Sequence, residues 1–510
     1  HIAELLRFGK AEKINEAQVK GWTSAWLLAQ PKKRRLRPIF EPGTNRSLHR
    51  SAMVPLRHVS RAVMRREATN SQWSIQIDFA AWYDQLPLSE EVRPYFCFRH
   101  RGKDGDEFYR LTRVPMGASW SCALGQSITD VVVGETRSPN VCVHSLIDNV
   151  KVGSHNPAEF LAAVRRMAAT CRTLNITVSP IETPRGFVPL AEWVMLDDKV
   201  ILADAAAHAA AHIWLGEAFS RVANRFGGPT GIANSPELVA KLERAFGRLL
   251  AARGQHGHIA DHVTRRHVVA LIGLITWMAN TIAIPMSRLY AILRLSSAIG
   301  YAATADGGWN RPVGFISDSM IESMADIVNT LVSNVPVAPT TWHARRGLVD
   351  DYDVIAMVDA SQSGWAAIIW RRTDAGWSAT EVSAGWSAGV ASRHSAHAEP
   401  LAAARALEYI RRAFGADVSI ALVTDHRAIA GAQVREDGYG GYSPSANLNG
   451  FYDAFYDTRP GTRRDVYFVP GDENLADAAS RLLGRGPTLQ VRAINTPVPN
   501  LATMWNGATE

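Results

Sequence analysis

Two aspartates in the first third of the chain stand where side chains could act on a bound cation. Asp78 ends "WSIQID" (73–78), in which apolar and polar residues alternate. Asp148 and Asn149 lie at the centre of "HSLIDNVKVGS" (144–154), between two short apolar runs typical of a hairpin. A water-facing strand end and an ordinary Asp-Asn turn explain each residue equally well when it is taken alone. The hairpin tip therefore has three interpretations at this point: a working metal site, a damaged one, or a turn.

Four further acids follow beyond residue 350, each next to a predicted strand or helix. Asp359 and Asp425 end hydrophobic strands, and Glu399 stands at the start of a predicted helix. Asp477 comes three residues after Asn474, which is also the arrangement of a helix cap. Capping is the simpler reading for Asp477 alone, so the order of the four acids carries more information than any one of them.

The elements that would carry these acids follow from hydrophobic periodicity. Ile75 and Ile77 lie on one face of the strand and Asp78 on the other, which predicts a half-buried strand. The segment "SPELVAKLERAFGRLLAARG" (235–254) has a Ser-Pro-Glu start, a helical stripe and a glycine stop. We expect five parts: 1–200, mixed strands and helices; 201–300, helical; 301–349, a connection with a proline-marked linker; 350–485, alternating strands and helices; and 486–510, a proline-containing tail.

Bulk composition limits the class of protein. The 510 residues predict two to four globular domains, and their net charge of +7 favours a polyanionic partner. The four cysteines form no CxxC pair, so we expect a reducing compartment and neither a disulfide scaffold nor a zinc knuckle. The most apolar stretch, 268–278, is too short to span a bilayer, so no membrane segment is expected. The chain starts at His1, which we interpret as a fragment of a longer product.

Several motifs stand in an order that resembles the reverse transcriptases of retroelements. The segments "IDFAAWYDQLPL" and "LIDNVKVGS" resemble the two palm motifs that carry the catalytic acids. Other segments resemble the fingers, the template-side palm motif, the primer-grip hairpin and the first thumb helix: "LRPIFEP" (36–42), "VPMG" (114–117), "AEWVML" (191–196) and "VVALIGLITWMANTI" (268–282). Each motif alone is weak, and their shared order makes the signal strong.

The resemblance implies nucleotide addition by two-metal phosphoryl transfer. Asp78 and Asp148 would hold two Mg²⁺ ions, or Mn²⁺, with help from the Phe79 carbonyl and from Asn149 in place of the usual second acid. The resemblance also implies a nucleotide site and a primer grip. The nucleotide-site residues would be Arg37 and Lys33 on the triphosphate, Tyr83 under the sugar, and Met116 and Gly117 beside the nucleotide; the primer-grip residues would be Trp193, Val194 and Met195.

Four departures from the family pattern concern the polymerase site. Leu146 replaces the hairpin tyrosine, Trp82 replaces a small residue, and Asn149 removes one negative charge beside the metals. Arg185 is the nearest cation where the family often places a lysine, and arginine is a poor proton donor. Asn149 keeps a carbonyl oxygen that can accept or weakly ligate, so we interpret the site as functional with a weaker hold on metal.

The four acids after residue 350 occur in an order that resembles ribonuclease H. The resemblance covers about 350–485, and it implies that Asp359, Glu399, Asp425 and Asp477 clamp two Mg²⁺ ions during phosphodiester hydrolysis. No histidine follows His426, so the loop histidine of many family members is missing. The pair His208 and His212 has metal-ligand spacing, but a solvent-facing helix is the simpler reading.

Together these observations predict a multidomain α+β fold: a right-hand polymerase of fingers and palm (1–200) and thumb (201–300), followed by an α/β ribonuclease H-like domain. The expected function is RNA-directed DNA synthesis with degradation of the RNA strand, most like tyrosine-recombinase retrotransposons of the DIRS and VIPER type. The expected partners are an RNA template, a DNA primer, RNA–DNA hybrid and deoxynucleoside triphosphates, in an intracellular location, cytoplasmic or nuclear. Two alternatives stay open: a decayed nucleic-acid-binding relic, and a ribonuclease H whose polymerase site is inactive.

Overall fold

The structure is a computed structural model that separates into two compact units. The first unit comprises 1–59 and 67–211, and the second comprises 60–66 and 212–510. The described residues are 2–30, 35–47, 61–102, 105–221, 230–282, 284, 286–337, 348–387, 395–430, 446–456, 462–481, 486–504. Across these ranges, every helix is too short or too polar to cross a membrane.

A three-stranded antiparallel sheet forms the centre of the first unit. Its order is β4 (Trp73–Asp78), β8 (Asn149–Ser154), β7 (Val141–Leu146). Ile75 and Ile77 point into the core, as the alternation predicted, because one face of the sheet packs on apolar helix residues such as Phe160 and Met167. Ser74 on the opposite face is also buried, so this end of the strand is covered on both sides.

Helices and smaller sheets surround this central sheet. The helix α5 begins at Pro157 because the Asn156 side chain caps the backbone N–H groups of Ala158 and Glu159. A second three-stranded sheet has the order β1 (Ala11–Ile14), β6 (Gly105–Leu111), β5 (Cys97–Gly102), and two strand pairs are β2 (Thr23–Gln30) with β3 (Arg35–Pro42) and β9 (Ile181–Thr183) with β10 (Gly186–Val188). The helices, with α5 (Pro157–Thr173), are α1 (Ile2–Arg7), α3 (Trp82–Gln85), α4 (Ser121–Gly134), α6 (Leu190–Trp193) and α7 (Asp198–Ala210).

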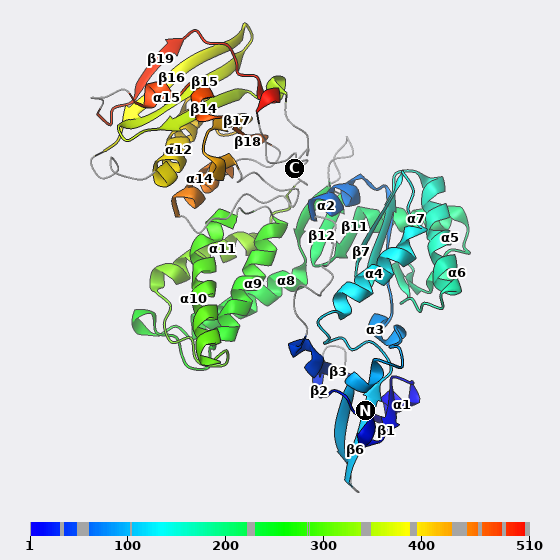
Figure 1. The fold of residues 1–510 in the computed structure, drawn as a ribbon. Helices are drawn as coiled ribbons and strands as arrows, with labels where there is room; N and C mark the ends of the chain where they lie inside the picture. The colour runs from blue at the N-terminus through cyan, green and yellow to red at the C-terminus, as the bar shows by residue number, and fades with distance from the viewer. Residues whose placement is uncertain are drawn as a thin grey trace. The chain divides into compact units, whose positions relative to one another are not determined.

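The second unit begins with a small sheet and a helical bundle (Figure 1). The elements are β11 (Ala211–Trp214), β12 (Glu217–Arg221), β13 (Thr230–Asn234), α8 (Pro236–Ala251), α9 (Arg265–Thr281), α10 (Tyr290–Asp306) and α11 (Asp318–Ser333). Met324 and Leu331 of α11 are fully buried in the same core as α8 and α9. The prediction of a connection from residue 301 is therefore wrong as far as residue 333, because α11 carries its own apolar stripe into the bundle.

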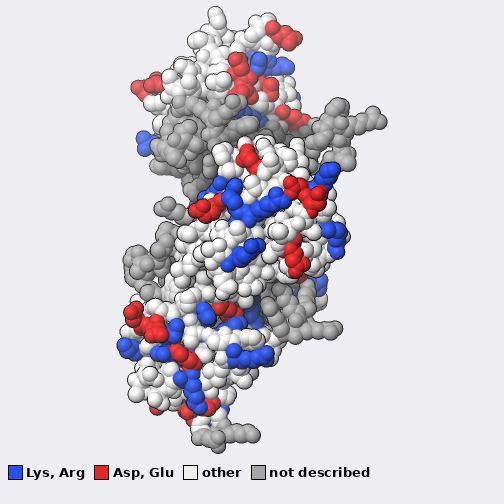
Figure 2. Space-filling view, turned by 90° about the vertical axis from the view of Figure 1, so that its right-hand side faces the viewer, with Lys and Arg blue, Asp and Glu red and all other residues white. Residues whose placement is uncertain are grey.

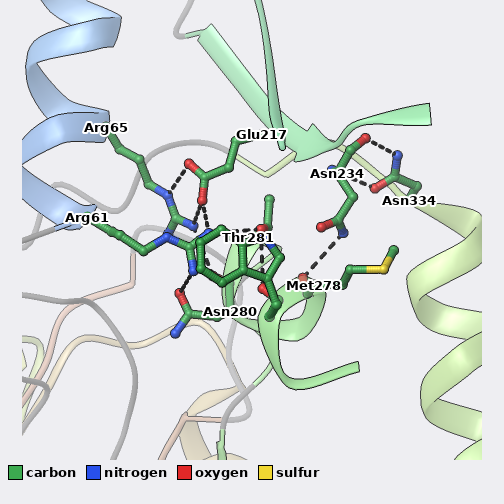
Figure 3. Close-up of polar contacts among 9 residues, drawn as sticks. Arg61, Arg65, Glu217, Asn234, Met278, Asn280, Thr281 and Asn334 are labelled. Atoms are coloured by element: carbon green, nitrogen blue, oxygen red, sulfur yellow. Dashed lines mark hydrogen bonds and ion pairs between the residues drawn. The ribbon is translucent and has the colours of Figure 1, made fainter. Parts of the chain in front are cut away.

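Two of the arginines that contribute to the positive net charge form ion pairs inside the second unit. Arg61 and Arg65 of α2 (Arg61–Asn70) both bind Glu217 (Figure 3). The Arg61 guanidinium also lies 4.2 Å from the centre of the Trp277 ring. Burial alone would raise the pKa of Glu217, but the two arginines outweigh burial and lower it. On the face drawn in Figure 2, lysine and arginine side chains are interspersed with acidic ones.

A six-stranded sheet builds the last part of the second unit. Its order is β18 (Arg464–Phe468), β17 (Ile420–Thr424), β14 (Val354–Ala360), β15 (Gly364–Thr373), β16 (Gly376–Gly385), β19 (Gln490–Ile494). The strands β14, β15 and β16 are antiparallel, whereas β17 and β18 run parallel to β14. The helices α12 (Ser395–Phe414) and α14 (Ala446–Tyr456) cover one face (Figure 1). The other face buries Trp370 and Tyr467.

The predicted tail, 486–510, is instead part of this sheet as far as it is described. The strand β19 pairs with β16, and Leu501 is fully buried beside Trp370. The strand was missed because its residues are mostly exposed, so an edge strand held by backbone hydrogen bonds leaves no apolar alternation to find. The multidomain α+β class predicted from the sequence is confirmed.

We expect Leu501→Ala to lower the free energy of unfolding of the second unit by about 2–5 kcal/mol, the usual cost of a cavity in a packed core. Urea unfolding followed by tryptophan fluorescence measures this difference. The matched control is Leu489→Ala, because Leu489 is 44% exposed and should change the free energy by less than about 0.5 kcal/mol. Equal effects of the two substitutions would contradict the packing of the C-terminal segment.

Candidate active sites

The first site lies where β4 ends beside the tip of the β7–β8 hairpin. The register places Asp78 opposite Asn149, and the backbone N–H of Phe79 donates to the Asp148 carbonyl oxygen at 2.9 Å. Burial raises the pKa of Asp148, and the neighbouring charge of Asp78 raises it further, while Arg37 lowers it. The structure therefore brings together two acids that are seventy residues apart in the sequence.

The hairpin tip is held in an uncommon backbone conformation. Ile147 has φ +57°, a region that β-branched residues rarely adopt. Two side chains of α4 hold Ile147 in place. The backbone N–H of Ile147 donates to Gln126 Oε1 at 2.8 Å, and Thr129 Oγ1 donates to the Ile147 carbonyl oxygen. Such strain persists only where surrounding contacts over-determine it, and here it fixes the position of Asp148, the next residue.

Hydrogen bonds hold the side chains of this site. Ser179 Oγ donates to Asp78 Oδ2 at 2.8 Å, and Asn149 Nδ2 donates to Asp148 Oδ1 at 3.1 Å. The residue that replaces the usual second acid thus acts as a donor to the first acid. A hydrogen bond of this kind favours the ionised form of Asp148, which a metal requires.

The predicted nucleotide-site residues lie on several elements around these acids. Tyr83 of α3 is half-buried; burial raises its pKa, and Cys122 and Asp148 raise it further. Gly117 allows no side chain, since a Cβ there would lie 1.9 Å from the carbonyl oxygen of Phe40 on β3. Met116 is 38% exposed, and the Phe79 side chain is fully buried. Lys33 lies outside the described residues.

The prediction that residues 191–196 form a primer-grip hairpin is wrong, because the segment begins with a helix and not with a strand. Leu190–Trp193 forms the short helix α6, and Trp193 and Val194 are buried while only Met195 is exposed. The Trp193 indole N–H donates to Asp204 at 2.9 Å, which also pairs with Arg185. Local hydrogen bonds after Pro189 override the strand-like composition of this segment, and two of the three side chains face the core instead of a primer.

A hairpin does follow in the sequence, between β11 and β12. Its two-residue turn is Leu215 and Gly216, both with positive φ, as tight hairpins require. The sequence signal for this hairpin is "IWLGEAF" (213–219), in which apolar residues flank a Leu-Gly turn.

The two histidines with metal-ligand spacing, His208 and His212, do not share one helix, because α7 ends at Ala210. His208 contacts Ser74 at 2.8 Å, and His212 stacks on Phe219. Their spacing therefore does not form a metal site.

The second site gathers acids from three adjacent elements of the six-stranded sheet and its helix. Asp359 lies on β14, Asp425 directly follows β17, and Glu399 is on α12; one oxygen of each lies within 4.8 Å of the others. Asp477 begins α15 (Asp477–Ser480) and pairs with Arg481 at 2.6 Å. The charge of Asp477 raises the pKa of Asp359 and of Glu399, so the fourth predicted acid also belongs to the cluster.

Burial makes this cluster unfavourable without a cation. Burial raises the pKa of Glu399 to about 9, and Asp359 and Asp425 contribute to the increase. Among the described residues, no donor reaches the buried Oε2 of Glu399. Asp359 accepts one hydrogen bond from Ser480 Oγ. A cluster of carboxylate oxygens with one buried oxygen left without a donor fits a hard divalent cation such as Mg²⁺.

Mg²⁺ binding at the second site should strengthen with pH up to about 9. Below that pH Glu399 is protonated in the metal-free protein, so binding must release its proton. Since an unfolded glutamate has a pKa near 4.3, the metal-free fold also loses stability as pH rises from about 4 to about 9. Calorimetry of Mg²⁺ binding to an Asp78→Asn protein, in buffers of different ionisation enthalpy, measures the released proton. Glu399→Gln should abolish the release, and an affinity independent of pH would contradict the assignment.

Comparison with known proteins agrees with the location of the first site. Residues 21–181 match the family described as "Reverse transcriptase (RNA-dependent DNA polymerase)". The matched residues include Asp78 and Asp148. No curated protein matches the sequence.

Solved structures similar to this chain include the foamy viral protease-reverse transcriptase dRH in complex with double-stranded DNA (TM-score 0.44, 12% identity), over 83% of this chain and 61% of that one. The foamy viral protease-reverse transcriptase in complex with double-stranded DNA has a TM-score of 0.44 and 14% identity, over 83% of this chain and 73% of that one. The chain thus spans less than two thirds of the length of the first of these proteins.

Proposed function

Because residues 21–181 carry a reverse transcriptase domain, we propose that the chain is an RNA-directed DNA polymerase. The observation that carries this proposal is the pairing of Asp78 with the Asp148–Asn149 tip inside that domain. Divalent ions held by the two acids would stabilise the charge that develops on the transferred phosphoryl group. The Phe79 carbonyl would supply a further oxygen ligand.

The residues around the acids bind and orient the nucleotide in this proposal. Arg37 supplies a positive charge close enough to lower the pKa of Asp148, as a triphosphate partner would require. Tyr83 supplies an aromatic face beside Asp148 that excludes a ribose 2′-hydroxyl. Gly117 permits the close approach of the Phe40 carbonyl, and so of β3, the strand that carries Arg37. The RNA template, DNA primer and deoxynucleoside triphosphates are the proposed substrates.

We also propose that the second site hydrolyses the RNA strand of an RNA–DNA hybrid. The support is the four-acid cluster of Asp359, Glu399, Asp425 and Asp477 on a mixed sheet, together with the sequence resemblance to ribonuclease H. Mg²⁺ fits the oxygen donors of this cluster. An origin in a tyrosine-recombinase retrotransposon and an intracellular location complete the proposal.

The two activities should separate by single substitutions. Asp78→Asn should abolish primer extension on an RNA template and leave hybrid cleavage intact, because it removes a metal ligand from the first site only. Asp359→Asn should do the reverse. Extension of a labelled primer and cleavage of a labelled RNA strand, both in Mg²⁺, measure the two activities on the same preparations.

Exposed acids provide matched controls for this pair. Asp198→Asn in the first unit and Asp374→Asn in the second remove the same charge from the surface, and both activities should stay within about twofold of the unchanged protein. Hybrid cleavage without extension in the unchanged protein would establish the nuclease-only alternative. Absence of both activities in folded protein that binds the hybrid would identify a relic.

Asn149→Asp should retain extension and lower the Mg²⁺ concentration for half-maximal activity by roughly thirtyfold, since one added charge about 4 Å from a dication contributes about 2 kcal/mol in water. The unchanged protein should correspondingly respond more strongly to Mn²⁺. Metal titrations of primer extension with both proteins test this expectation. Loss of extension by folded Asn149→Asp protein would show that the amide is required as a hydrogen-bond donor to Asp148.

A further inference from the structure

A cluster of nitrogen, sulfur and oxygen donors lies within the first unit, on the covered polar face of the central sheet. Cys142 and His144 are two residues apart on β7, so their side chains point to the same face. Glu67 reaches them from α2, and one donor atom of each of the three residues lies within 4.8 Å of the others. The pair His144 Nε2 and Glu67 Oε2 is 2.5 Å apart. Polymerase chemistry uses none of these side chains.

Neighbouring residues orient the cysteine. Ser71 Oγ lies 3.3 Å from Cys142 Sγ, and the thiol also donates to the Gly153 carbonyl oxygen at 3.2 Å. Gly153 makes room for this arrangement, because a Cβ there would lie 2.4 Å from Ser71 Oγ and 3.1 Å from Cys142 Sγ. Glu67 and Ser71 are four residues apart, and Ser71 Oγ donates back to the Glu67 carbonyl oxygen. The C-terminal end of α2 and the strand β7 therefore pack against each other around Cys142 Sγ.

The donor set has the chemistry of a transition-metal site. A thiolate, an imidazole and a carboxylate are the three ligand types of zinc, and the combination differs from the all-oxygen sets of the two carboxylate sites. His144 is 5% exposed, whereas the Glu67 side chain is 34% exposed, which leaves an entry path on one side.

We propose that Glu67, Cys142 and His144 bind a zinc ion, with water in the fourth position. The ion takes the place of the proton on the thiol and of the hydrogen bond between His144 and Glu67. It fastens α2 to β7 four residues before Asp148, so it is a structural clamp on the strand that leads to the catalytic tip. The site does not depend on the proposed polymerase activity.

Cobalt substitution tests the site without any activity assay. The full chain is stripped with a chelator and titrated with Co²⁺, whose bond to a thiolate produces a near-ultraviolet charge-transfer band. The two carboxylate sites contain no sulfur ligand, so they cannot produce this band. We expect the band to saturate at one Co²⁺ per chain and to disappear when Zn²⁺ is added.

Matched variants assign the band to this cluster. Cys142→Ala should abolish it, while Cys171→Ala, the same change in the core of α5, should leave it unchanged. Ser71→Ala, which removes a partner of the sulfur, should weaken Co²⁺ binding by about 10–100-fold. Glu67→Gln should weaken it at least as much, and its partly exposed position on α2 makes it the deciding variant if Cys142→Ala does not fold.

The proposal is overturned if excess Co²⁺ gives no thiolate band in the unchanged protein, or if the band survives Cys142→Ala. It is also overturned if folded Glu67→Gln protein binds Co²⁺ with unchanged affinity. In each case the cluster would be a polar network completed by Lys151, and zinc would not raise the melting temperature of the chain.

Discussion

The register between β4 and β8 is the constraint on which the first site depends. Side chains alternate between the two faces of a sheet, so a slip of one residue would turn Asp78 toward Phe160 and expose Ile77 to the polar side. The apolar core therefore selects the register, and the register in turn aligns Asp78 with Asn149. The arrangement of the acids at the first site is therefore fixed by hydrophobic residues of the core.

In the second unit, the packed sheet must hold several acids that repel each other. Asp359 and Glu399 are almost fully buried beside two other acids, and their raised pKa values record the cost of that position. Large buried side chains such as Trp370 and Tyr467 pack the same sheet and stabilise it while the acids repel each other. A divalent cation bound among these oxygen atoms would relieve the repulsion.

Features encoded by local patterns could be predicted, and those set by tertiary contacts could not. The alternation of Ile75 and Ile77 predicted β4, and the chain order of acids predicted that Asp78 would meet Asp148. Trp193 was misplaced because tryptophan and valine suit a strand, while hydrogen bonds after Pro189 form a helical turn. Glu67 and His144 are 77 positions apart, and the sequence around each residue gives no sign that α2 packs against β7.

The strand β19 also determines how the second unit behaves toward other copies of itself. Without it, β16 would present a row of unpaired backbone groups, which is the usual template for edge-to-edge aggregation. The strand that replaces β16 at the edge exposes Gln490, Val491 and Arg492, and Arg492 pairs with Glu381 at 2.6 Å. The last described segment of the chain thus covers the edge of β16 and places a charged side chain on the new edge, which disfavours pairing with the edge of another copy.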